Sequence, residues 1–364
     1  MQDTIKDKLK INRQSNIELL RVIAMIFIIA HHFSVHGGFN FSADVTTVNS
    51  LWIQFIKIGG KIGVNIFVLI SGYFLINTKT VKTSKAFKLW FQIFSYSVFI
   101  YMLFVLIGLE PFGKRNFIKQ CLPITYSKWW FASTYFILYL LCPFINKLLV
   151  SLDKKSYLNL LIILGVCWCI IPTFTGEAVQ SNSLLWFVFL YALAGYIRLY
   201  SPKSENKGIT YILLSFIIAI ITWISYVLII KFEIKTLTLD FYGMQQLPIL
   251  VISVLLLLGF LKITVKPNNI INIISSATFG VYLIHDNGYV RPFIWKTVFK
   301  NAAYSESKYF IPYSIFVIAI VFVVCTIIEL LRIYIFEKKY IKIIEFSANN
   351  FDALKEKMLS NVNK

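Results

Sequence analysis

Ten apolar segments of membrane-spanning length dominate the sequence and restrict it to one fold class. A helix needs about 17–25 mostly apolar residues to cross the hydrocarbon core, and in lipid its backbone hydrogen bonds must be satisfied internally. We therefore predict an all-α, polytopic integral membrane bundle of about ten transmembrane helices. The segments cover residues 16–36, 52–76, 86–108, 130–150, 157–176, 183–200, 209–230, 245–263, 270–290 and 311–336. Because the second contains Gly59, Gly60 and Gly63, we expect it to be broken or to start late.

The composition supports this fold class and argues against two others. The chain is 58% hydrophobic and 15% charged, whereas soluble domains are about 25% charged. Its five cysteines are scattered through mostly apolar segments, and no pair has the spacing of a metal site. We interpret them as small buried hydrophobic residues. Neither a disulfide framework nor a metal centre is predicted.

The net charge of +19 is distributed as membrane topology requires. If the N-terminus is cytoplasmic, 23 of the 36 Lys and Arg residues fall on the cytoplasmic side and 12 on the other, with Arg21 inside the first span. This asymmetry favours two cytoplasmic termini and accounts for the charge without nucleic acid. We predict a cytoplasmic segment 1–15, a membrane domain 16–336 and a cytoplasmic tail 337–364. The first span is expected to be a retained signal anchor of a multi-pass cell-membrane protein, and the Lys, Asn, Ile and Phe bias suggests a bacterial source.

The first span carries ionisable residues that are costly in hydrocarbon. At 100° per residue, Glu18, Arg21 and His32 form one stripe, while His31 points about 80° away from Arg21. Such residues usually face the bundle interior or a water-filled cavity. His32 is a candidate general base, and Arg21 could hold an anionic group. The alternative is a structural Glu18–Arg21 pair with histidines at an interface.

Five segments in order resemble acyltransferase family 3 membrane proteins. The first is E-x-x-R (Glu18, Arg21) followed eleven residues later by His32. Next come GGKIGVNIFVLISGYFL (59–75) and a K-x-x-K pair, Lys85 and Lys88, where the family usually has R-x-x-R. KWWFASTYFILYLLCPFIN (128–146) and ATFGVYLIHDN (277–287) follow. The resemblance covers about residues 16–336.

This resemblance implies O-acylation, most often O-acetylation, of a carbohydrate. Acetyl-CoA would be the donor substrate, and no permanently bound cofactor is expected. The functional His of the family maps onto His32 and its Arg onto Arg21, with Glu18 beside it. The basic pair that serves the donor maps onto Lys85 and Lys88, and lysine lacks the bidentate fork of arginine. Many relatives carry an extra extracytoplasmic SGNH-type hydrolase domain, which this chain has no room for.

Four further residues are candidates for the site. Ser71 could contact the donor or act as a nucleophile if a base lies within reach, although tight packing of Ser71 with Gly72 is the simpler interpretation. Trp130 could stack on a sugar or belong to an aromatic belt. Tyr282 and His285 are candidate acceptor contacts, with an interface cap as the alternative for His285.

Two other functions remain open at this stage. A transporter or flippase for a lipid-linked sugar would share the basic loops and the buried ion pair, although no inverted repeat is evident. A non-catalytic scaffold for polysaccharide assembly is the other. The expected partners are acyl-CoA, membrane lipid and a saccharide or lipid-linked glycan acceptor of capsule, exopolysaccharide or wall. Polysaccharide-assembly proteins are further candidates, and nucleic acid is not expected.

Overall fold

The structure is a computed structural model of the chain. It describes residues 14–39, 41, 46–177, 179–201, 207–232 and 241–362, with side chains to residue 358. The predicted segment 1–15 therefore lies almost wholly outside the described residues, and its placement is untested.

The described residues are helical and contain no strand, as predicted. Eight helices are long and apolar enough to span a membrane, and two shorter apolar helices, α12 and α13, complete the ten predicted segments. The elements are α2 (Ser15–His36), α3 (Val48–Lys57), α4 (Gly59–Leu75), α5 (Thr83–Leu106), α6 (Lys114–Cys121), α7 (Trp130–Ser151), α8 (Lys154–Gly165), η1 (Val166–Ile170), α9 (Ile171–Thr175), α10 (Ser183–Tyr200), α11 (Gly208–Lys231), α12 (Leu247–Lys262), α13 (Asn269–His285), α14 (Val290–Pro292), η3 (Phe293–Val298), η4 (Asn301–Tyr304), α15 (Phe310–Leu331), η5 (Arg332–Glu337) and α16 (Lys338–Val362).

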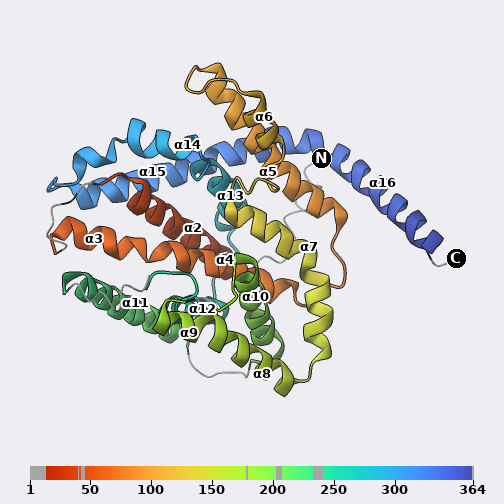
Figure 1. Cartoon of the computed structure of the whole chain (residues 1–364), viewed down its shortest axis with the longest axis horizontal. Helices are drawn as coiled ribbons and strands as arrows, with labels where there is room; N and C mark the ends of the chain where they lie inside the picture. Colours follow the sequence, from red (N-terminus) through yellow and green to blue (C-terminus); the bar gives the residue numbers. More distant parts are fainter. Residues whose placement is uncertain are drawn as a thin grey trace.

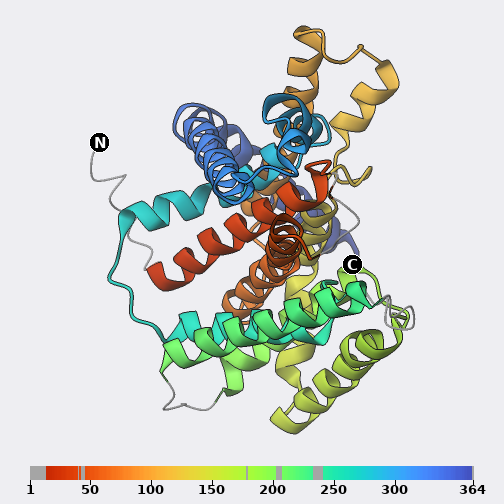
Figure 2. The ribbon, with the colours of Figure 1, turned by 90° about the vertical axis from the view of Figure 1, so that its left-hand side faces the viewer.

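Helices α2 and α4 form the centre of the bundle. They pack against each other, and the α13–α15 pair covers them on one side while α10, α11 and α12 lie on the other (Figures 1 and 2). In the middle of α4, Asn65 is fully buried and hydrogen-bonds to the Met244 carbonyl and to Trp186. Because unsatisfied polar groups are costly in a bundle interior, these bonds secure the central helix against its neighbours.

The second span has a one-residue interruption at Ile58, next to its glycines, although Val48–Leu75 together form one span of 28 residues. Helix α3 ends at Lys57 and α4 begins at Gly59. The carbonyl of Lys57 accepts a hydrogen bond from Nδ1 of His31 at 2.7 Å. A Cβ at Gly60 would overlap the His31 ring, and one at Gly63 would lie 2.5 Å from the Ala24 carbonyl oxygen. The glycines therefore allow α2 and α4 to approach closely, and His31 lies at this contact.

The last span continues into a long polar helix. A π-helical segment, η5, joins α15 to α16, and α16 extends beyond the bundle (Figure 1). The hydroxyl of Thr83 at the start of α5 donates to Asp352 of α16 at 2.6 Å. The predicted tail is thus a helix that contacts α5 over part of its length.

Candidate active site

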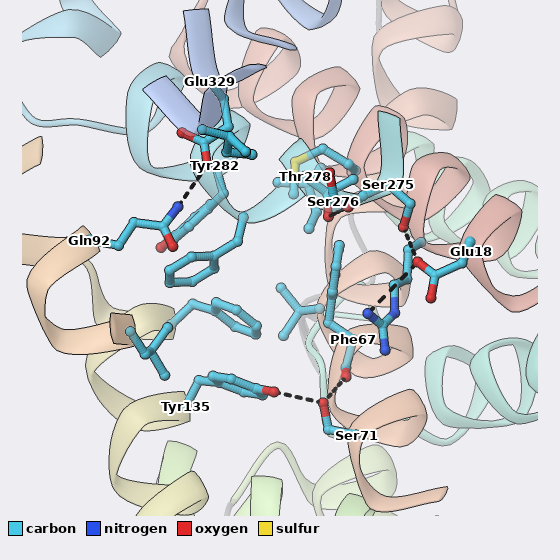
Figure 3. Close-up of a pocket in the computed structure, with 18 of the residues that line it drawn as sticks. Glu18, Phe67, Ser71, Gln92, Tyr135, Ser275, Ser276, Thr278, Tyr282 and Glu329 are labelled. Carbon is cyan, nitrogen blue, oxygen red and sulfur yellow. Dashed lines mark hydrogen bonds and ion pairs between the residues drawn. The ribbon is translucent and has the colours of Figure 1, made fainter. Parts of the chain in front are cut away.

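A cavity of about 530 Å³ lies among α2, α4, α5, α7, α13, α15 and η5 (Figure 3). Glu18 and His32 both border it. They are fourteen residues apart on α2, which corresponds to about 21 Å of helix rise. The cavity therefore follows much of the length of the central helix. Lys88 and Arg332 border it as well, at the end of the bundle where α15 ends.

His32 is held by a second histidine from the other half of the chain. Nδ1 of His32 lies 2.9 Å from Nε2 of His285, and Nδ1 of His285 lies 2.6 Å from the carbonyl oxygen of Val281. His285 is fully buried at the end of α13 and does not border the cavity. Its position behind His32 differs from the predicted direct contact with the acceptor.

These two contacts determine which nitrogen of neutral His32 is a base. A carbonyl oxygen only accepts, so Nδ1 of His285 carries the hydrogen and its Nε2 is an acceptor. Nδ1 of His32 must then be the donor, which leaves the lone pair on Nε2 of His32. The His32 side chain is 12% exposed and borders the cavity. The arrangement is a base whose orientation is fixed by a third group, as general-base catalysis requires.

A carboxylate lies close enough to stabilise a protonated His32. Oδ1 of Asp286 is 3.7 Å from Nδ1 of His32 and 3.2 Å from Nη1 of Arg291. His36, the last residue of α2, lies 3.4 Å from the same Arg291 nitrogen. Donor atoms of His32, His36 and Asp286 all lie within 4.8 Å of one another. The Arg291 guanidinium beside two of them disfavours a metal ion there, and we assign none.

The predicted pair of Glu18 and Arg21 is present in the cavity wall. Nη1 of Arg21 is 3.9 Å from Oε2 of Glu18, which also accepts a hydrogen bond from Ser275 (Figure 3). Nε of Arg21 is buried and has no hydrogen-bond partner among the described residues. Since Arg21 borders the cavity, it can donate to an anionic or carbonyl group that enters there.

Of the predicted basic pair on α5, only one lysine borders the cavity. Lys88 borders the cavity and pairs with Glu337 of η5. Lys85 is exposed on α5 and does not border the cavity. Arg332, which the sequence did not single out, lies beside Lys88 and binds both Glu329 and Glu337.

Ser71 borders the cavity but hydrogen-bonds to groups that are not bases. Its hydroxyl donates to the Phe67 carbonyl at 2.9 Å and lies 3.0 Å from the Tyr135 hydroxyl (Figure 3). The neighbouring Gly72 packs against the backbone of Tyr191, where a Cβ would lie 2.5 Å from the carbonyl oxygen. This geometry is that of helix packing, and within the described segments no basic side chain hydrogen-bonds to the Ser71 hydroxyl.

Aromatic residues form another part of the cavity wall. Trp130 borders it with Nζ of Lys61 5.3 Å from its ring centroid. Tyr282 is buried, borders the cavity, and its ring packs edge-on against Phe131 and His285. Of the predicted site residues, only Lys85 and His285 do not border this cavity.

The comparisons with known proteins agree with this architecture. The acyltransferase domain that defines acyltransferase family 3 matches residues 14–330. The chain belongs to this family and is a multi-pass membrane acyltransferase. No curated protein and no solved structure matches it.

Proposed function

We propose that the protein transfers an acetyl group from acetyl-CoA to a hydroxyl of a cell-surface or lipid-linked saccharide, with His32 as general base. The observation that carries the proposal is the His32–His285 hydrogen bond beside the cavity, because it leaves Nε2 of His32 free to accept a proton. General-base catalysis contributes typically 10²–10⁴-fold.

In the proposed reaction, Nε2 of His32 takes the proton of the acceptor hydroxyl as its oxygen attacks the thioester carbonyl carbon. The new C–O bond forms and the C–S bond breaks. The proton on Nε2 passes to the leaving thiolate, so the products are the ester and free CoA. Asp286 stabilises the positive charge that His32 carries between these steps, since its carboxylate is 3.7 Å from Nδ1.

The donor would lie along α2. Its phosphates bind near Lys88, with Lys85 one turn away adding long-range attraction, and its extended arm carries the thioester past Arg21 toward His32. Arg21 and His32 are eleven residues apart, about 16 Å of helix. Glu18 holds Arg21 in place, and the free Nε of Arg21 is a donor for the arm or a phosphate. Ser71 contributes to the wall on the donor path.

The acceptor would enter at the His32 end. Trp130 offers a flat aromatic surface of the kind on which sugar rings pack, and Tyr282 lies beside it through Phe131. His285 acts on the acceptor through His32. The acceptor class, a bacterial capsule, exopolysaccharide or wall glycan, follows from the family resemblance.

The experiment is label transfer. Membranes that contain the protein, given radiolabelled acetyl-CoA, are expected to yield a labelled saccharide, and the His32→Ala variant at equal protein level is expected not to. A flippase or a scaffold would move or assemble glycan without transferring label, so wild-type membranes that yield no labelled saccharide would refute the proposal.

A further inference from the structure

Four charged side chains meet where η5 closes one end of the cavity. Lys88 of α5 and Arg332 both bind the carboxylate of Glu337, with Nη2 of Arg332 3.1 Å from Oε2. Arg332 also binds Glu329 of α15 through two nitrogens, at 2.7 and 2.8 Å. We call these four residues the η5 charge cluster. Its two cations and two carboxylates balance.

The two carboxylates of the cluster differ in how they are held. Glu329 is 1% exposed and accepts further hydrogen bonds from Gln92 at 2.9 Å and Tyr96 at 2.5 Å. It is a fixed, fully satisfied partner of Arg332. Glu337 is 14% exposed and faces Lys88, whose side chain is 42% exposed. Apart from Lys88 and Arg332, no hydrogen-bond or ion-pair partner of Glu337 is found in the described part of the chain.

The Lys88 side chain is 42% exposed, so water screens its pair with Glu337 and the pair contributes little to stability. Glu337 also has fewer partners and more exposure than Glu329, so its contacts are the part of the cluster that an incoming anion can replace. A phosphate group carries at least as much negative charge as a carboxylate and prefers the planar donors of arginine. With Glu337 displaced, Lys88 and Arg332 present adjacent donors to the cavity.

We propose that Arg332 and Lys88 together bind a phosphate group of the acyl donor, and that Glu337 is the internal counterion which this phosphate displaces. Glu329 keeps Arg332 in position throughout. The proposal rests on the proposed function for the identity of the donor. It assigns to Arg332 a hydrogen-bond donor for phosphate that the Lys85–Lys88 pair lacks, the Nη2 hydrogen that Glu337 now accepts, while Nε and the other Nη2 hydrogen stay on Glu329 and Nη1 donates to Tyr340. It assigns to Glu337 a role in setting donor affinity.

The location of Glu337 is suited to such an exchange. It ends the π-helical segment η5, directly before α16, and π segments inside helices occur frequently at functional sites. Helix α16 is held to α5 further along, by Thr83 with Asp352 and by the rings of Phe87 and Phe351. Glu337 can therefore turn out of the cavity without the loss of these α16–α5 contacts.

The test measures binding of free CoA to the purified full-length protein, so that no acceptor and no turnover are needed. Glu337→Gln keeps the size of the side chain and removes the competing charge. We expect it to tighten CoA binding about tenfold, equivalent to about 1.4 kcal/mol, with the gain reduced at high salt. Glu345→Gln, an exposed carboxylate on α16 outside the cavity, is the matched control and should leave CoA affinity unchanged.

A second variant tests Arg332 without leaving a buried charge. In the double variant Arg332→Gln, Glu329→Gln both partners are neutral, and CoA binding is expected to weaken about tenfold or more relative to wild type. CoA affinity that is unchanged or weaker in Glu337→Gln, or an equal gain for the phosphate-free fragment pantetheine, would overturn the proposal. If Glu337→Gln tightens CoA binding but the wild-type protein transfers no acyl group, only the proposed function is refuted. If the wild-type protein transfers the acyl group but Glu337→Gln leaves CoA affinity unchanged, only the counterion role is refuted.

Discussion

Nδ1 of His32 lies 2.9 Å from Nε2 of His285. This contact joins α2, the first described helix, to the last residue of α13. Nδ1 of His285 donates a hydrogen bond to the Val281 carbonyl at 2.6 Å, so Nε2 of His285 accepts and Nδ1 of His32 carries the hydrogen between the two rings. His32 is thereby oriented and kept in one tautomer beside the cavity. His285 is a positioning residue, since it does not border the cavity itself.

The first prediction concerns His285. In His285→Leu the acceptor at Nε2 is lost, so His32 should populate the wrong tautomer and orientation. The turnover number is expected to fall about 10- to 100-fold, within the range that general-base catalysis supplies, while KM for acetyl-CoA stays the same. In His285→Gln the side-chain oxygen can take the place of Nε2 and should restore part of the rate. Equal rates for the Gln and Leu variants would contradict the positioning role.

The second prediction separates His32 from its neighbour. His32→Ala should lower acyl transfer by about 10²–10⁴-fold in folded protein, because it removes the base. His31→Ala removes the donor to the Lys57 carbonyl at the break between α3 and α4. It should lower the unfolding temperature and leave the rate per folded molecule much less affected. The two variants are compared by thermal unfolding and by label transfer at matched protein amounts, and a loss of transfer confined to His31→Ala would overturn the assignment.

Hydropathy and helical periodicity predicted the parts of this structure that depend on local sequence. The ten spans follow from apolar length, and the interruption of the second span at Ile58 lies directly before Gly59 and Gly60. The phase of one helix also brings Glu18, Arg21 and His32 to the cavity, but His31 borders the same cavity, so helical phase alone does not separate the two histidines. Orientation along a helix is a local property, and one sequence is enough to infer it.

The pairing of His32 with His285 spans 253 residues and could not be inferred from the pattern of either helix. The sequence does not mark Arg332 as a site residue for a different reason. Basic residues near the end of a span are ordinary topology signals. The buried acid three residues before it, Glu329, was the available signal, because an unpaired carboxylate in an apolar span requires a partner.

A third prediction tests the approach of α2 and α4. Gly60→Ala would place a Cβ within the space of the His31 ring, and rigid packing makes such an insertion cost about 1–3 kcal/mol. Thermal unfolding of the purified protein should show a lower midpoint. Gly288→Ala is the control, since a Cβ there meets no atom within 4 Å. Equal midpoints for Gly60→Ala and wild type would show that the contact can relax.

The last prediction divides the basic pair on α5. Lys88 borders the cavity and pairs with Glu337, whereas Lys85 is exposed outside it. Lys88→Ala should therefore raise KM for acetyl-CoA about three- to tenfold, because one charge-assisted contact to a phosphate is lost. Lys85→Ala should raise it by a smaller factor that disappears at high salt, since its attraction acts only at long range through solvent.

Lys154→Ala provides the control for this comparison, because Lys154 is an exposed lysine at the start of α8, outside the cavity. Its KM for acetyl-CoA should equal that of wild type at both low and high salt. The measurement is KM for acetyl-CoA of the three variants at two salt concentrations. If Lys85→Ala and Lys88→Ala raise KM equally at both, the two lysines act together as the family motif suggests. The prediction that Lys88 contributes more to donor binding because it borders the cavity would then be wrong.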